Sequence, residues 1–268
     1  MALRICKAVI KDNKIISSAR TVDQLLEFIK PLLMDDEQGG KEESFEFEEG
    51  QESVARLVHM IAHPSNADNY YDLLLRFKKM FSKGGVARQK YTYPALFFAL
   101  IRLSVFINYP PEQLRAEEVK ADNDGDFEAE PAPTVQASQP KIFKNLSELI
   151  GALQSSQPDL TLRLNLQAAQ AINNLRQVTG LEDQAYEFMS NAYIIFEEEV
   201  TESEAKVVAL NLIVSTLYTL TCFGGDNFDT LSANAVSYSN KLLKKNLQAE
   251  AICLASHLYF CTSRKQGT

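Results

Sequence analysis

The chain has 268 residues, of which 46% are apolar and 23% charged, and its formal net charge is −8. A chain of this length can bury a substantial core. Its acidic balance, with basic residues scattered along it, argues against a nucleic-acid-binding groove. It contains no signal-peptide pattern and no run of about 18 uncharged apolar residues, so we expect no membrane insertion.

The predicted elements are all helices. Apolar residues recur at three- and four-residue spacings along the chain, with breaks of only a few residues, which is the pattern of amphipathic helices. It predicts helices over residues 2–18, 21–34, 52–63, 67–82, 93–109, 142–156, 159–178, 182–199, 202–222, 228–245 and 247–262. Each helix has to bury its apolar stripe against its neighbours. The sequence therefore predicts an all-α fold, a single α-solenoid segment of HEAT-like antiparallel helical hairpins over residues 1–268.

Several residue types mark the expected helix ends. Thr21, with a glutamine three residues later, has the side chains of a capping box, and Asp68 can accept bonds from the first free amides of the next helix. The glycines at 84–85, 180 and 224–225 lie where helices are predicted to end. We therefore expect them to form left-handed C-terminal caps.

The charge is unevenly distributed. Residues 35–52 carry a net charge of −8 and residues 112–130 carry −6, which leaves +6 on the rest of the chain. Segments with few apolar residues and many like charges do not gain enough by burial to become ordered. We expect acidic flexible inserts at about 36–50 and 112–140. An alternative is that these inserts mask the basic surface or bind a basic partner.

Enzyme motifs are incomplete. His59 and His63 have a spacing that can place two imidazoles on one helical face, but Met60 stands where a zinc protease needs glutamate. No third ligand is evident, and no phosphate-binding loop or nucleophile-elbow motif occurs. We therefore predict a protein that is not an enzyme and needs no metal or cofactor. A metal hydrolase would require both histidines to converge with carboxylates in the fold.

The four cysteines are Cys6, Cys222, Cys253 and Cys261. Their spacing is not that of a metal site, and each lies in or beside a predicted helix. We expect buried free thiols in a cytosolic protein, in preference to disulfides.

Two residues near the C-terminus do not follow the apolar stripe of their helix. In the predicted helix 247–262, His257 and Phe260 point about 100° or more away from parts of that stripe. An aromatic side chain and an imidazole in such positions indicate a contact surface. Packing against a neighbouring repeat would explain them as well, and the helical pattern leaves both interpretations open.

A resemblance to a known family decides between them. The segments AYEFMSNAYIIFEEE (185–199), TLTCFGGDN (219–227), KLLKK (241–245) and ASHLYF (255–260) resemble, in this order, the C-terminal half of the large α-solenoid subunit of retromer, the vacuolar protein sorting-associated protein 35 family. Residues 52–85 and 91–103 are similar to consecutive upstream segments of that family. The resemblance covers most of the chain apart from the two acidic inserts.

The resemblance implies a non-enzymatic scaffold of the retromer coat in the retrieval of membrane cargo from endosomes. Its expected partner is the small metallophosphoesterase-fold subunit, vacuolar protein sorting-associated protein 29, and the segment resembling ASHLYF contributes a histidine to that interface. We expect the partner-binding residues His257, Phe260, Tyr218 and Phe223. The protein would be cytoplasmic and peripheral on endosomal membranes, recruited through coat partners. The motif that engages the arrestin-like subunit does not occur, so binding to that subunit is not implied. A generic HEAT- or armadillo-like peptide-binding adaptor is the alternative.

Overall fold

The computed structural model describes residues 2–12, 14–34, 45–61, 66–108, 136–175 and 180–260. The chain divides into two compact units, Met1–Leu149 and Ile150–Thr268, and each is considered by itself. Regular structure in the described residues is helical, apart from one isolated bridge between Ile16 and Ile61. The all-α fold class is therefore confirmed, whereas the union of both units in one continuous solenoid stays a prediction.

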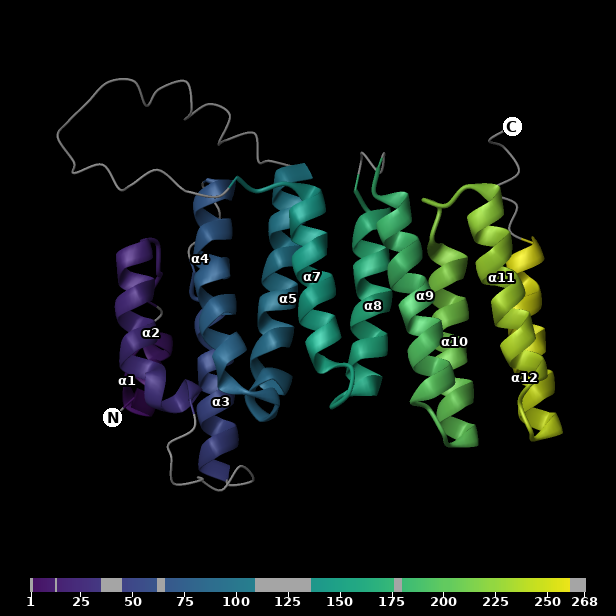
Figure 1. Cartoon of the computed structure of the whole chain (residues 1–268), viewed down its shortest axis with the longest axis horizontal. Coiled ribbons are helices and arrows are strands. Elements are labelled where there is room, and N and C mark those ends of the chain that lie inside the picture. Colours follow the sequence, from purple (N-terminus) through teal and green to yellow (C-terminus); the bar gives the residue numbers. More distant parts are fainter. Residues whose placement is uncertain are drawn as a thin grey trace. The chain divides into compact units, whose positions relative to one another are not determined.

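Unit 1 contains two layers of helices (Figure 1). Its elements are α1 (Ala2–Lys11), α2 (Ala19–Leu33), α3 (Phe45–Val58), α4 (Ala67–Phe81), the 3₁₀ turn η1 (Ser82–Gly84), α5 (Val86–Asn108) and most of α7 (Gln139–Leu153). The helix α1 contacts α2 and α3, α2 contacts α4, and α5 contacts both α3 and α4. One layer is therefore formed by α1, α3 and α5, and the other by α2 and α4.

The core of unit 1 is rich in aromatic side chains from α4 and α5. Tyr71, Phe77, Phe81 and Phe97 are fully buried, and the rings of Phe77 and Phe81 meet edge to face with their centroids 5.6 Å apart. The side-chain amide of Asn145 on α7 donates to the hydroxyl of Tyr71 at 2.7 Å. Burial of these rings, together with the buried aliphatic side chains of the same unit, stabilises the packing of the layers.

The helix α5 is long and apolar enough, by length and composition alone, to cross a membrane. Half of the most apolar 18-residue stretch of α5 is buried inside the protein, and α5 packs on α3 and α4. Arg102 of the same helix donates a hydrogen bond to the hydroxyl of Tyr70 on α4. These contacts show that α5 is a core helix of unit 1.

Unit 2 repeats the two-layer arrangement (Figure 1). Its elements are α8 (Pro158–Asn173), α9 (Glu182–Glu198), α10 (Ser203–Thr219), α11 (Gly225–Asn240), α12 (Lys245–Ser256) and the 3₁₀ turn η2 (His257–Phe260). The helix α10 contacts α8 and α12, while α9 contacts α11. Sequential helices form antiparallel hairpins, which is the packing that the sequence predicts for an α-solenoid.

An aromatic cluster joins α9 to α11. The ring of Tyr238 stacks on Tyr193 with a centroid distance of 5.6 Å and meets Phe196 edge to face at 5.2 Å. The Tyr193 hydroxyl donates to the carbonyl oxygen of Leu231 at 2.9 Å, and burial raises the pKa of Tyr193. Burial and the adjacent Glu197 carboxylate raise the pKa of Tyr238 to about 12.

The helix ends differ from several predictions. The capping oxygen of α2 belongs to Ser18, which accepts from the Thr21 amide at 3.1 Å, and Asn66 caps α4 by accepting from the amides of Asp68 and Asn69. The predicted capping roles of Thr21 and Asp68 are therefore wrong.

The glycines have two different roles. Gly85 and Gly180 have the positive φ angles of 72° and 84° that a left-handed residue requires. Gly224 has a φ of −64° and precedes α11, which begins at Gly225. The prediction that the pair at 224–225 ends a helix is therefore wrong, because it begins the next one.

Several predicted boundaries in unit 1 are corrected, among them the start of α5, which lies at Val86 and not at residue 93. The helix α1 ends at Lys11, not at residue 18, because the chain becomes extended and the Ile16 amide donates to the carbonyl oxygen of Met60 at 2.9 Å. The helix α3 begins at Phe45 and not at residue 52, so it includes residues 45–50 of the first predicted insert. Acidic residues in the first turn of α3 favour this start, since they interact well with the helix dipole. Residues 35–44 and 109–135 lie outside the described residues.

Candidate functional site

Three of the four residues predicted to bind a partner are exposed at one end of unit 2. Tyr218 lies in the last turn of α10, Phe223 in the following loop, and His257 and Phe260 in η2. The turn η2 continues from α12 and also contacts α10. The end of α10 and the end of α12 lie at the same end of unit 2 in Figure 1.

The segment 257–260 is not the α-helix that the sequence predicts. The helix α12 ends at Ser256, and residues 257–260 form a 3₁₀ turn in which Leu258 alone is buried. A 3₁₀ helix has about three residues per turn, so side chains three apart lie on the same face. His257 and Phe260 therefore share one exposed face. Residues 261–262 of the predicted helix lie outside the described residues.

We define the aromatic end of unit 2 as Tyr218, Tyr259 and Phe260. Their exposed fractions are 52%, 56% and 77%, whereas aromatic side chains more often lose most of their surface on folding. Tyr259 was not among the predicted residues. Its position next to Phe260 in the same short turn is the only sequence signal that could have indicated it. Neighbouring exposed aromatic side chains are typical anchors of protein–protein interfaces.

Phe223 differs from the other predicted residues because it is only 7% exposed. Leu220, at the end of α10, is completely buried. Both apolar side chains of the 220–224 loop therefore point into unit 2. Phe223 offers a partner little surface and instead helps to seat the loop.

Two polar side chains from the preceding helices bind the backbone of this loop. The side-chain oxygen of Asn173, at the end of α8, accepts from the Thr221 amide at 2.7 Å, the Thr221 hydroxyl at 3.2 Å and the Cys222 amide at 3.0 Å. The carboxylate of Glu182, at the start of α9, accepts from the Gly224 amide at 2.7 Å and from the Asn227 side chain at 2.8 Å. We call Asn173 and Glu182 the loop anchor.

The loop anchor is also an electrostatic arrangement. The hydrogen bonds from Gly224 and Asn227 stabilise the ionised carboxylate and lower the pKa of Glu182. Glu182 lies in the first turn of α9, where the helix dipole favours a negative charge. A single carboxylate therefore stabilises the start of α9 and holds the start of α11.

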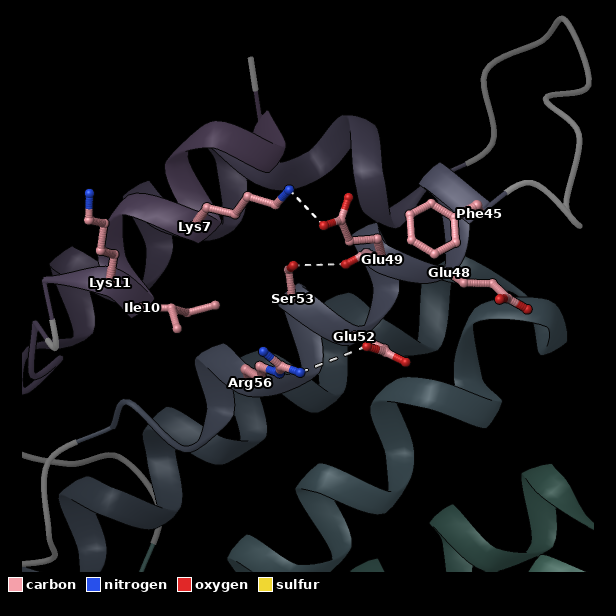
Figure 2. A pocket seen from close by; sticks show the side chains of 9 residues that line it. All are labelled: Lys7, Ile10, Lys11, Phe45, Glu48, Glu49, Glu52, Ser53 and Arg56. Carbon is pink, nitrogen blue, oxygen red and sulfur yellow. Dashed lines mark hydrogen bonds and ion pairs between the residues drawn. The ribbon is translucent and has the colours of Figure 1, made fainter.

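The structure also contains a hollow in unit 1 between α1 and α3, with a volume of about 350 Å³ (Figure 2). Four of its six charged side chains form two ion pairs: Lys7 with Glu49 at 2.8 Å, and Arg56 with Glu52 at 3.9 Å. Figure 2 shows that the first pair joins α1 to α3, whereas the second lies along α3. Three basic and three acidic side chains thus line a site that presents no excess charge to a ligand.

Of the two histidines that a metal hydrolase would require, the structure describes His59. His59 lies in the turn after α3, and burial together with the positive charge of Arg102 lowers its pKa. His63 lies outside the described residues. Among the residues described, no group of three His, Cys, Asp or Glu side chains could hold a metal ion.

Three of the cysteines can be placed. Cys6, Cys222 and Cys253 form no disulfide among the described residues, and burial raises the pKa of Cys6 to about 11. Cys253 is exposed on α12, so the prediction that it is buried is wrong. Cys261 lies outside the described residues.

Comparison with known proteins identifies the family. The family model described as vacuolar protein sorting-associated protein 35 matches residues 1–268. The chain is 36% identical to vacuolar protein sorting-associated protein 35A of Arabidopsis thaliana, over 99% of the chain and 31% of the relative. It is 34% identical to protein 35C of the same plant, over 100% of the chain and 32% of that relative. It is 28% identical to protein 35 of Dictyostelium discoideum, over 97% of the chain and 32% of that relative. The chain thus spans about a third of the length of these relatives, and it belongs to the vacuolar protein sorting-associated protein 35 family.

Proposed function

We propose that this chain is a non-enzymatic scaffold segment of the retromer coat that binds the metallophosphoesterase-fold subunit, vacuolar protein sorting-associated protein 29. The proposal is supported by membership of the family, whose name refers to vacuolar protein sorting. The single structural observation that carries it is the exposure of three aromatic side chains at one end of unit 2. The coat would act in the retrieval of cargo from endosomes, to the Golgi or to the cell surface.

The mechanism is geometric. Stacked helices present side chains at fixed positions, so a partner gains affinity from a few anchors while the surrounding contacts exclude water. Phe260 is the strongest anchor candidate because 77% of its surface is exposed before binding. Burying a phenylalanine side chain contributes about 1.5–3 kcal/mol. His257 lies on the same face of η2 and supplies a polar contact beside it.

Tyr218 and Phe223 have different parts in this proposal. Tyr218 adds a second exposed ring, from the last turn of α10, and its hydroxyl can exchange hydrogen bonds with a partner. Phe223 is buried and supports the loop that follows α10. We propose that Phe223 contributes to binding through the shape of this loop.

The proposed location is the cytoplasmic side of endosomal membranes. Membrane association would be indirect, through other coat subunits and cargo. The proposal includes no cofactor, no metal held by this chain and no nucleic acid.

Calorimetric titration of the chain with the purified small subunit tests the proposal. We expect His257→Arg and Phe260→Ala each to weaken binding by about thirtyfold, equivalent to about 2 kcal/mol. Arginine brings a permanent charge into a surface that loses water on binding, and alanine removes the anchor. Circular dichroism of each variant checks that the helices remain.

Phe45→Ala is the matched control. Phe45 belongs to unit 1 and is 79% exposed, close to the value for Phe260. Its truncation therefore removes a similar exposed ring from a part of the chain outside the aromatic end. We expect the affinity of this variant to equal that of the unaltered chain. Equal affinity of all variants would contradict the site assignment. Binding of extended peptides without affinity for the small subunit would favour the adaptor alternative.

A further inference from the structure

We infer that Asn173 and Glu182 are positioning residues of the partner-binding surface: they hold the loop after α10 so that the aromatic end of unit 2 is ordered before a partner arrives. This inference rests on the proposed function. It assigns a role to a corner between α8 and α9 that carries none of the predicted binding residues.

One side chain, that of Asn173, makes three hydrogen bonds to the loop. A single oxygen of Asn173 accepts from two consecutive backbone amides, at Thr221 and Cys222, and from the Thr221 hydroxyl. Asn173 and Thr221 are 48 residues apart, so this contact joins one hairpin to the next. Removing the oxygen would leave both amides to be satisfied by water, and the extended loop would lose the bonds that fix it.

Glu182 holds the other end of the same loop. Its carboxylate accepts from the Gly224 amide and from the Asn227 side chain, which lie immediately before and within the first turn of α11. The N-cap residue of α11 is Gly224, which has no side chain to cap the helix. The loop is therefore bound at both of its ends by side chains from α8 and α9.

The loop directly follows the helix that carries part of the aromatic end of unit 2. The loop begins at Leu220, two residues after Tyr218, and the Leu220 amide still bonds to the carbonyl oxygens of Thr216 and Leu217. The same helix, α10, contacts η2, which bears Tyr259 and Phe260. A loop that moves would allow the last turn of α10 to fray. Ordering this segment in advance lowers the entropic cost of binding.

The experiment compares variants of the loop anchor in the whole chain. Asn173→Ala and Glu182→Ala remove the accepting oxygens, Asn173→Asp keeps an acceptor in the same place, and Glu187→Gln changes a charge on an exposed residue of α9. We expect the two alanine variants to bind the small subunit about fivefold to tenfold more weakly. Asn173→Asp should recover most of the affinity, and Glu187→Gln should bind like the unaltered chain.

Hydrogen exchange of the free chains supplies a measurement that does not depend on the partner. In Asn173→Ala the amides of residues 217–224 should exchange faster, and in Asn173→Asp their protection should return. Unchanged exchange in Asn173→Ala would overturn the inference. So would a loss of thermal stability without any change in affinity at a temperature where the variant is fully folded, because the anchor would then only stabilise the fold. A chain that fails to bind the small subunit contradicts the proposed function, and the exchange rates still decide whether the anchor orders the end of α10.

Discussion

The guanidinium group of Arg88 donates from Nε to the carbonyl oxygen of Leu32 at 3.2 Å and thereby joins α5 to the C-terminal end of α2. Its other nitrogens donate to the carbonyl oxygens of Gly84 at 3.2 Å and Met34 at 3.4 Å. The group also lies over the ring of Phe47 at 5.1 Å. A buried cation thus donates to carbonyl groups at the ends of α2 and η1, and the Leu32 carbonyl also accepts from the Gln51 side chain at 2.8 Å.

We expect Arg88→Met to lower the free energy of unfolding of unit 1 by about 2–3 kcal/mol, because methionine fills the space but donates to none of the three carbonyl groups, although the Leu32 carbonyl keeps a side-chain donor, Gln51. Urea denaturation followed by circular dichroism measures the change. Arg56→Met is the control, since Arg56 is exposed and pairs with Glu52 at 3.9 Å. Its effect should stay within about 0.5 kcal/mol. Equal effects of the two substitutions would refute the role of Arg88.

Two glycines should respond in opposite directions to replacement by alanine. Gly180 has a φ of +84°, where a Cβ atom costs about 1–2 kcal/mol, so Gly180→Ala should destabilise the chain. Gly151 lies within α7, and a Cβ atom added there meets nothing within 4 Å. Gly151→Ala should therefore raise the free energy of unfolding of the chain by about 0.5–1 kcal/mol. Thermal unfolding of both variants checks the signs, and a gain in stability at Gly180 would contradict the backbone argument.

Truncation of Tyr238 should separate its ring contacts from its hydroxyl bond. Tyr238→Phe loses the 2.8 Å bond to Glu197 and keeps the contacts with Tyr193 and Phe196, so we expect a loss of about 0.5–1 kcal/mol. Tyr238→Ala also loses the ring contacts with Tyr193 and Phe196 and should lower the free energy of unfolding by about 2–3 kcal/mol. Denaturant midpoints of both variants provide the comparison. Equal losses would mean that the hydroxyl bond, and not the stack, joins α9 to α11.

The bonds made by Glu182 predict a dependence of stability on acid pH. Its pKa is lower in the folded chain than the ordinary value of about 4.3, so its contribution is fully present above that ordinary value and is lost as the pH falls through the folded pKa. Glu182→Gln has no proton to take up there. The difference in melting temperature between the unaltered chain and this variant should therefore be larger at pH 7 than at pH 3. A constant difference across this range would show that the charge of Glu182 does not contribute.

Helix existence and helix boundaries were not equally predictable. The stripe of Phe188, Met189, Ala192, Tyr193 and Phe196 predicts α9, and all five side chains are buried in it. Local chemistry was less informative about ends: Thr21 and Ser18 are both possible caps, and the hydroxyl of Ser18 is the one placed to accept from a free amide. Similarly, a glycine pair can end one helix or begin the next, and the connection after α10 decides this at Gly224.

The sequence by itself determined the all-α class and the identity of most helices, because apolar periodicity is a property of neighbouring residues. The candidates at the C-terminal end followed from the resemblance of local sequence segments to a known family. Only the tertiary structure decided which candidates are exposed. Phe223 and Phe260 are both phenylalanines near a helix end, yet Phe223 is buried in unit 2 and Phe260 faces solvent. The bond between Asn173 and Thr221 joins residues 48 positions apart, and no periodicity within a helix can indicate a contact that depends on how one hairpin packs against the next.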